Sequence, residues 1–170
     1  MARIHYIIGD ATKPLVKDGE FSLIVHCCNT LGAWGAGFVI PLGKRYPKAK
    51  ESYLNYIRNN YPKLGQVDEV KVSDNIYVEN LMGQSFLGCG ENGEIPCSYT
   101  AIEEGFLNII HNSECSKENE KFTIHMPRIG CGLAGGDWSV IEKIINKTFC
   151  KDGIDVFVYD LREDGKTNYE

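Results

Sequence analysis

Hydrophobic positions along the chain fall into short apolar runs separated by longer amphipathic stretches. Short apolar runs bounded by turn residues are typical of buried strands. Residues 23–28 are apolar on both faces except at His26, which is typical of a central strand in a sheet covered on both sides. Residues 67–72 are more polar, which indicates a strand nearer the edge of the sheet. The predicted strands are residues 4–8, 23–28, 67–72, 76–82, 122–126 and 154–159.

The amphipathic stretches predict three or four helices between these strands. Pro47 suits the first position of a helix, and an apolar stripe follows it to about residue 59. Residues 100–103 and residues 139–142 both follow the pattern S/T-x-x-E, a capping box that predicts the start of a helix. Each of the two patterns precedes apolar residues at helical spacing, so we expect a long helix behind each of them.

The remaining segments connect these elements. Residues 38–42 predict one helical turn that Pro41 stops or kinks. Residues 112–121 are polar and predict a surface loop, and residues 162–170 predict a frayed polar tail. Strands and helices alternate without an internal repeat or a low-complexity linker, so residues 1–161 are expected to form one domain. The predicted class is α/β, a three-layer sandwich in which a mixed six-stranded sheet has helices on both faces.

The length and the charge of the chain exclude several classes of function. A chain of 170 residues is the usual size of one domain. Eighteen Lys and Arg against 23 Asp and Glu give a net charge of −5, which argues against stable nucleic-acid binding. No apolar run approaches the ~20 residues of a membrane span, and residues 1–10 lack the pattern of a secretory signal. We therefore expect a cytoplasmic protein, or a nucleocytoplasmic one in a eukaryote, without a membrane partner. The oligomeric state is left open.

The pattern of the seven cysteines predicts reduced thiols rather than disulfide bonds or a metal centre. Their number is odd, and no two of them form a C-x-x-C pair. A structural zinc site would need such pairs or a matching set of Cys and His residues. Most of these cysteines are expected to be small buried hydrophobic residues. We therefore predict no metal site and no cofactor.

Two glycine-rich loops carry the candidate chemistry. Residues 29–37 and residues 130–136 each follow an apolar strand and precede a helix. Such a junction leaves backbone N–H groups free and directs a helix N-terminus outward, and both features favour an anion such as phosphate. A single loop of this kind would more often be a tight turn, but two in matched positions favour a phosphate-binding cleft. Neither loop is a Walker A motif or a G-x-G-x-x-G fingerprint.

Four motifs together resemble the macrodomain family, the ADP-ribose-binding module. They are Gly-Asp-Ala-Thr at residues 9–12, the first loop with its entry at residues 26–37, Arg-Tyr-Pro-Lys-Ala at residues 45–49, and Met-Pro-Arg-Ile-Gly-Cys-Gly-Leu-Ala-Gly-Gly-Asp-Trp at residues 126–138. The resemblance runs in order from about residue 3 to residue 161. Within the family the chain is most similar to two branches, the yeast-type ADP-ribose 1''-phosphate phosphatases and the terminal ADP-ribose glutamate hydrolases.

The resemblance implies a set of ligand contacts. Asp10 would accept a hydrogen bond from the adenine amino group, Asn29 would bind the distal ribose, and Tyr159 would lie near the adenine. Each also has a plainer interpretation: Asp10 and Asn29 as turn residues, and Tyr159 as an ordinary core tyrosine. The implied ligand-binding residues are Asp10, Ala11, Asn29, Gly35, Ala36, Gly37, Gly130, Cys131, Gly132, Leu133, Ala134 and Tyr159.

The candidate catalytic residues are His26, Asp137 and Asn29. His26 lies on the strand that enters the first loop, and a pKa near neutrality would suit it to proton transfer. A lone histidine in such a strand is otherwise a buried, hydrogen-bonded residue. Asp137 would orient or deprotonate a water beside the distal ribose, or would only favour the N-terminus of the following helix. Cys131 is a rival nucleophile, which we rank lower because glycines flank it and no histidine adjoins it.

Two departures from the glutamate-hydrolase branch favour the phosphatase branch. That branch has an aspartate where this chain has Ala134, and it has a lysine near residues 81–84, which read Leu-Met-Gly-Gln here. A lysine nucleophile is therefore missing at that position. The resemblance predicts removal of phosphate from ADP-ribose 1''-phosphate without a metal ion. The alternatives are an ADP-ribosyl or O-acyl-ADP-ribose hydrolase and a non-catalytic reader of ADP-ribose.

Overall fold

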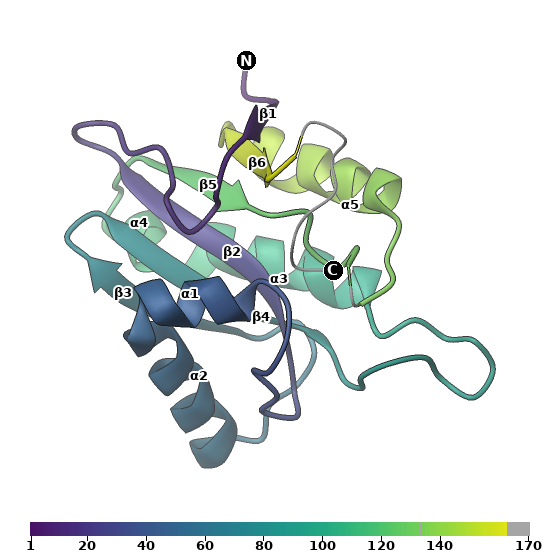
Figure 1. Ribbon diagram of the computed structural model, residues 1–170. Coiled ribbons are helices and arrows are strands. Elements are labelled where there is room, and N and C mark those ends of the chain that lie inside the picture. The colour runs from purple at the N-terminus through teal and green to yellow at the C-terminus, as the bar shows by residue number, and fades with distance from the viewer. Residues whose placement is uncertain (133, 163–170) are drawn as a thin grey trace.

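A six-stranded sheet forms the middle layer of the computed structural model, which describes residues 1–132 and 134–162 (Figure 1). Across the sheet the strands lie in the order β1-β6-β5-β2-β4-β3, and among the described strands only β3 runs antiparallel to its neighbour. All six predicted strands and the mixed sheet are confirmed. The strands are β1 (Ile4–Ile8), β2 (Phe21–Asn29), β3 (Val67–Ser73), β4 (Ile76–Gln84), β5 (Phe122–Met126) and β6 (Val156–Asp160).

Helices cover both faces of the sheet, as the alternating pattern predicts (Figure 1). Along β2, Ile24 and Cys28 pack toward α1 and α2, whereas Leu23 and Val25 pack toward α3 and α5. His26 is in phase with Ile24 and Cys28, so its side chain belongs to the α1–α2 face. The helices are α1 (Val39–Arg45), α2 (Pro47–Asn59), α3 (Tyr99–Asn112), α4 (Glu114–Lys117) and α5 (Trp138–Ile145), which continues into a π-helical turn, η1 (Asn146–Cys150).

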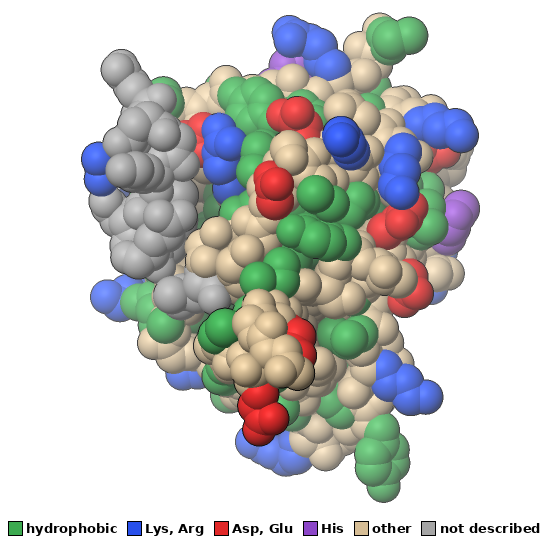
Figure 2. Space-filling view, turned by 90° about the vertical axis from the view of Figure 1, so that its right-hand side faces the viewer, with side chains coloured by type: hydrophobic (Ala, Val, Ile, Leu, Met, Phe, Trp, Pro, Cys, Tyr) green, Lys and Arg blue, Asp and Glu red, His purple; other side chains and the backbone are tan. Residues whose placement is uncertain are grey.

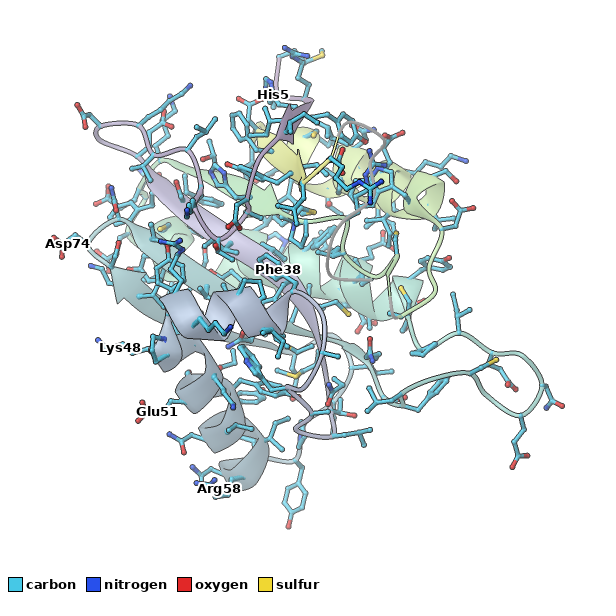
Figure 3. All side chains as sticks on the ribbon, in the orientation of Figure 1. His5, Phe38, Lys48, Glu51, Arg58 and Asp74 are labelled. Atoms are coloured by element: carbon cyan, nitrogen blue, oxygen red, sulfur yellow. The ribbon has the colours of Figure 1, made fainter. Side chains whose placement is uncertain are left out.

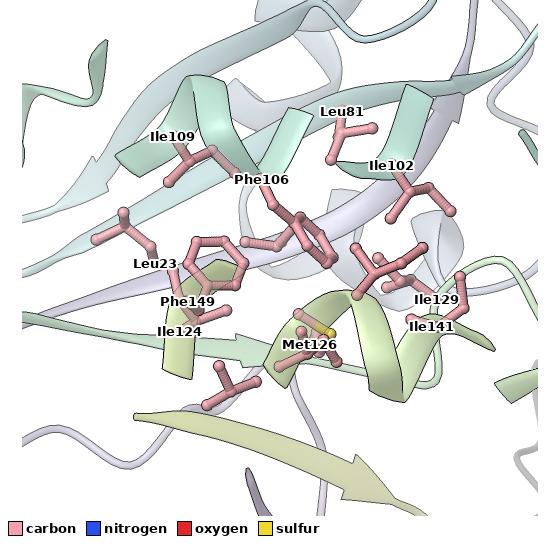
Figure 4. Close-up of a cluster of buried hydrophobic side chains, with 14 of the residues drawn as sticks. Leu23, Leu81, Ile102, Phe106, Ile109, Ile124, Met126, Ile129, Ile141 and Phe149 are labelled. Carbon is pink, nitrogen blue, oxygen red and sulfur yellow. The ribbon is translucent and has the colours of Figure 1, made fainter. Parts of the chain in front are cut away.

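The larger part of the core lies between the sheet and the layer of α3 and α5 (Figure 4). Phe106 of α3 and Phe149 of η1 meet there with ring centroids 4.7 Å apart. Leu23, Ile124 and Met126 close the cluster from the sheet, and all three are fully buried. This packing holds α5 and η1 against the sheet.

Both predicted capping boxes are wrong by two residues. The N-cap of α3 is Ser98, whose Oγ accepts from the Ala101 N–H at 3.2 Å, and the N-cap of α5 is Asp137. An N-cap residue needs an extended backbone. Ser98 and Asp137 both have it, whereas Thr100 and Ser139 already lie in the first helical turn.

Two predicted connections contain more helix than expected. The helical turn around Pro41 extends to Arg45, because a proline in the first turn removes an N–H that would have no partner there. The polar segment of residues 112–121 contains α4, which Ser113 caps by accepting from the Ser116 N–H at 3.2 Å. Residues 163–170 of the predicted tail lie outside the described residues.

No helix among the described residues combines the length and the apolar character that crossing a membrane requires.

Candidate functional site

A cavity of about 300 Å³ lies between the two glycine-rich loops. Parallel β2 and β5 are neighbours, and both strands end at this edge of the sheet. The crevice at the carboxyl ends of parallel strands is the usual ligand site of open α/β sheets. The loop residues in its wall are Ala33, Gly35, Ala36 and Gly37 from the first loop and Gly130, Gly132 and Ala134 from the second. Figure 2 looks onto this edge and shows exposed hydrophobic side chains between the charged ones.

Asn29 builds the first loop with its side-chain amide. Its Oδ1 accepts from the N–H groups of Leu31 and Ala33, both at 3.0 Å, and its Nδ2 donates to the Ala33 carbonyl at 2.9 Å. The hydroxyl of buried Tyr53 donates to the same Oδ1 at 2.9 Å. Asn29 lines the cavity, and its contact with a distal ribose stays a prediction.

Gly35, Ala36 and Gly37 present unused backbone donors in the cavity wall. Their N–H groups donate to no other group among the described residues. Gly37 has φ +84°, a conformation that favours glycine, whereas a Cβ added at Gly35 would meet nothing within 4 Å. Three successive free amides form the kind of concave donor surface that binds anions.

The second loop folds back on itself opposite the first. The Gly136 N–H donates to the Gly130 carbonyl at 2.6 Å, and the Gly135 N–H donates to the Gly132 carbonyl at 3.0 Å. Gly130 needs its glycine, because its φ is +74° and a Cβ there would approach the Cys97 sulfur at 2.8 Å. Cys131 is outside the cavity wall, where its Sγ donates to the Ile129 carbonyl at 3.4 Å. Leu133 lies outside the described residues.

His26 lines the cavity as a neutral imidazole. Burial lowers its pKa from the usual 6.5 to about 4, although a hydrogen bond with Asn80 opposes this shift. Its ring packs edge-on against Trp34 at 5.6 Å and beside Phe38 at 5.7 Å. Figure 3 labels Phe38 in the middle of the molecule, before α1. The pKa near neutrality predicted for His26 is therefore wrong, because the strand removes the ring from water.

The two thiols beside His26 remain protonated. Cys28 Sγ lies 3.7 Å from His26 Nδ1 and 3.5 Å from Nε2. Because the two distances are nearly equal, the sulfur does not lie on the lone-pair axis of either nitrogen. His26 is therefore not placed to deprotonate this thiol. Burial raises the pKa of Cys28 well above its ordinary value and that of Cys27 to about 12. Such thiols are poor nucleophiles.

Asp137 is exposed and outside the cavity wall. Its Oδ1 accepts from the backbone N–H and the hydroxyl of Ser139 at 2.9 and 2.8 Å, and these hydrogen bonds lower the pKa of the carboxyl. The geometry is that of an N-cap, the plainer of the two interpretations. A role for Asp137 in proton transfer stays a prediction.

The predicted adenine contacts also lie outside the wall of this cavity. Asp10 Oδ1 accepts from the N–H and the hydroxyl of Thr12 at 2.9 and 2.8 Å, which is a turn. Ala11 is buried next to it. Tyr159 is buried too, and its hydroxyl accepts from the Leu15 N–H at 2.9 Å and contacts His125 Nδ1 at 2.7 Å. Their contacts with an adenine stay predictions.

Sequence reasoning missed Arg128 as a wall residue. Its guanidinium lies between the rings of Tyr6 and Trp138, at 5.2 and 5.4 Å from their centroids, and donates twice to Asp160 at 2.7 and 3.0 Å. The charged residue inside the otherwise apolar Met-Pro-Arg-Ile motif was the available signal.

Both departures from the glutamate-hydrolase branch, the segment of residues 81–84 and Ala134, contribute to the cavity wall. Gln84 at the end of β4 and Ala134 in the second loop line it, so the wall has an amide and a methyl group there. The described residues place no three His, Cys, Asp or Glu side chains where they could hold a metal ion.

Comparisons with known proteins identify the fold family. No family model matches the chain. A macrodomain protein from Streptomyces coelicolor is 36% identical, with a TM-score of 0.76 over 93% of this chain and 99% of that protein. The chain belongs to the macrodomain family. A Bacteroides thetaiotaomicron protein of unknown function is 37% identical to this macrodomain, with a TM-score of 0.87 over 94% of it and 99% of that chain.

Curated relatives extend over almost the same length. The ADP-ribose 1''-phosphate phosphatase of Lodderomyces elongisporus is 27% identical over 162 residues, which are 92% of this macrodomain and 97% of the yeast protein. The protein of that name from Candida albicans is also 27% identical, over an alignment that covers 85% of this chain and 92% of the Candida protein. The resemblance to the macrodomain family and the three-layer fold predicted from sequence are confirmed.

Proposed function

We propose that this macrodomain binds ADP-ribose in the cavity between its two loops and hydrolyses ADP-ribose 1''-phosphate to ADP-ribose and phosphate. The yeast relatives support a phosphatase-type activity, because proteins named ADP-ribose 1''-phosphate phosphatase match this chain over nearly all of their length. The same site would accept the product, since ADP-ribose lacks only the terminal phosphate.

One observation carries the proposal: unused amides of two loops line a single cavity. Gly35, Ala36 and Gly37 supply donors on one side, and Gly130 and Gly132 lie on the other, their N–H groups likewise without an acceptor among the described residues. A diphosphate has acceptor oxygens on both of its sides, so it can use both loops at once. Amide donors also explain how a protein of net charge −5 binds an anion.

The hydrolysis needs a water and a group that takes its proton. The water oxygen would bond to phosphorus as one of its protons passes to the base, the bond between phosphorus and the 1'' oxygen would break, and that oxygen would leave with the proton that the base returns. Neutral His26 has a ring nitrogen with a lone pair, and it lies in the wall of the cavity. The protein would bind and orient the phosphate through the loops, while His26 accepts the proton.

Two departures from the glutamate-hydrolase branch favour this reaction over release of ADP-ribose from glutamate. None of residues 81–84, which read Leu-Met-Gly-Gln, can form the covalent sugar adduct that a lysine forms, and Ala134 cannot supply a carboxylate. A second candidate function is reading ADP-ribose without turnover. The low pKa of His26 and the position of Asp137 outside the cavity favour it, because both weaken general acid–base catalysis.

A turnover panel tests the proposal. Purified protein is incubated with ADP-ribose 1''-phosphate, with O-acetyl-ADP-ribose and with an ADP-ribosylated protein, and released phosphate or ADP-ribose is measured. We expect phosphate release from the first substrate at a rate well above that of either other substrate, and its loss in His26→Gln. Binding of ADP-ribose without turnover of any substrate would identify a reader instead.

A further inference from the structure

A chain of polar side chains, buried at its inner end, runs from the cavity to a hollow between α2 and β3. His26 Nε2 lies 2.5 Å from Asn80 Oδ1, Asn80 Nδ2 donates to Asp68 Oδ2 at 3.1 Å, and Ser52 donates to the Asp68 carboxylate at 2.9 and 3.1 Å. His26 and Asn80 are 2% and 0% exposed, so water does not compete for these contacts.

The outer end of the chain reaches the surface. Asp68 is half-buried, and together with Ser52 it lines a second hollow between α2 and β3. Lys48 and Glu51 line the same hollow, and Figure 3 shows both on the outer side of α2. Substitutions at this end can therefore be made without touching the cavity.

The acceptors around Asn80 determine how its amide is oriented. Its Nδ2 faces the Ala49 carbonyl at 3.1 Å and the Asp68 carboxylate at 3.1 Å, and neither a carbonyl nor a carboxylate donates a hydrogen bond. The nitrogen of the amide must therefore point toward them, and its oxygen must point toward His26. An amide oxygen only accepts, so the proton in the contact belongs to the imidazole.

We infer that Asn80 is a positioning residue that holds His26 as its Nε2–H tautomer, and that Ala49 and Asp68 hold Asn80 in the orientation this requires. Nδ1 then has the lone pair, and the Cys28 sulfur lies 3.7 Å from it. The orientation of a catalytic histidine by a second polar side chain is a general feature of such sites. The consequence for turnover rests on the proposed function, whereas the tautomer itself does not.

Nitrogen NMR tests the tautomer directly. In protein labelled with ¹⁵N-histidine at pH 7, the His26 ring is assigned by its loss in His26→Gln. We expect a proton on Nε2 and none on Nδ1. Asn80→Leu removes the acceptor at similar size, and we expect a detectable population with the proton on Nδ1. A proton on Nδ1 in the unaltered protein, or an unchanged tautomer in folded Asn80→Leu, would overturn the inference.

Two outer variants are the matched controls. Asp68→Asn keeps an oxygen that can accept from Asn80, and Ser52→Ala changes only the far side of Asp68, so both should retain the Nε2–H tautomer. In Asn80→Leu, we expect kcat for ADP-ribose 1''-phosphate to fall ~10²-fold or more while the Kd for ADP-ribose changes little. A changed tautomer with unchanged kcat would leave the positioning role standing and would contradict the catalytic role of His26.

Discussion

The side chain of His26 titrates far from its solution value because β2 holds it between Trp34 and Phe38, away from water. Its identity and its place before the first loop could be predicted from the sequence, but its pKa could not, since burial depends on residues far along the chain. Asp137 shows the same limit: the sequence places it before a helix, and only the fold leaves it outside the cavity wall.

His26 should make stability depend on pH in the acidic range. Its pKa falls from 6.5 in the unfolded chain to about 4 in the fold, so the unfolded chain binds the proton more readily. The stabilisation relative to His26→Gln is present above pH 6.5 and is lost as pH falls toward 4, by about 3 kcal/mol over this window. Urea unfolding of both proteins at several pH values measures it. If the free energies of unfolding of the two proteins changed in parallel with pH, the low pKa of His26 would be contradicted.

Two variants of Asp137 separate capping from catalysis. Asp137→Ala removes the N-cap of α5 and should measurably lower the free energy of unfolding, whereas Asp137→Asn keeps an N-cap oxygen and should change it little. Both substitutions remove the carboxylate, so a catalytic role of Asp137 would be lost in both variants, whereas its capping role would be lost only in Asp137→Ala. Since Asp137 lies outside the cavity wall, we expect Asp137→Asn to retain turnover of ADP-ribose 1''-phosphate within a few-fold. A ~10²-fold loss in this variant would make the carboxylate catalytic.

At the scale of elements, the six strands could be predicted because short apolar runs leave few alternatives, and β2 is buried along most of its length. The first residues of the helices could not be predicted, because an S/T-x-x-E pattern indicates a favourable pair of side chains but does not determine the backbone conformation of its first residue. Ser98 and Asp137 take the N-cap positions because their extended backbones precede the first turn.

Ser98 should stabilise α3 where Thr100 does not. Ser98→Ala removes the side-chain acceptor of the Ala101 N–H, and we expect a loss of ~1 kcal/mol in unfolding free energy. Thr100→Ala is the matched control, since Thr100 lies in the first turn and should cost less than ~0.5 kcal/mol. Thermal or urea unfolding compares the two. A larger loss in Thr100→Ala would restore the capping box predicted from sequence.

The first loop can be tested without disturbing its backbone. A Cβ at Gly35 meets nothing within 4 Å, so Gly35→Glu should fold normally while its carboxylate repels an anion at the neighbouring amides. We expect ADP-ribose affinity to fall at least ~10-fold, or ~1.4 kcal/mol. Leu31→Glu places the same charge on an exposed residue of this loop outside the cavity wall, and should leave affinity nearly unchanged. Normal binding by folded Gly35→Glu would remove this loop from the site.

At the scale of the whole molecule, the cavity follows from the topology. β2 and β5 are parallel neighbours, so the loops after them meet at one edge of the sheet, which the matched strand–loop–helix context in the sequence already indicates. The sequence could not show that Arg128 and Gln84 complete the wall, because they come from different strand ends and meet only in the fold.

Calorimetry with ADP-ribose and AMP tests the central claim, that the two loops hold one diphosphate, most directly. AMP has one phosphate and no distal ribose, so it can use only part of the paired amide surface. We predict that ADP-ribose binds at least ~10-fold more tightly than AMP, a difference of ~1.4 kcal/mol or more. Equal affinity for the two ligands would contradict a site in which both loops contact the same molecule.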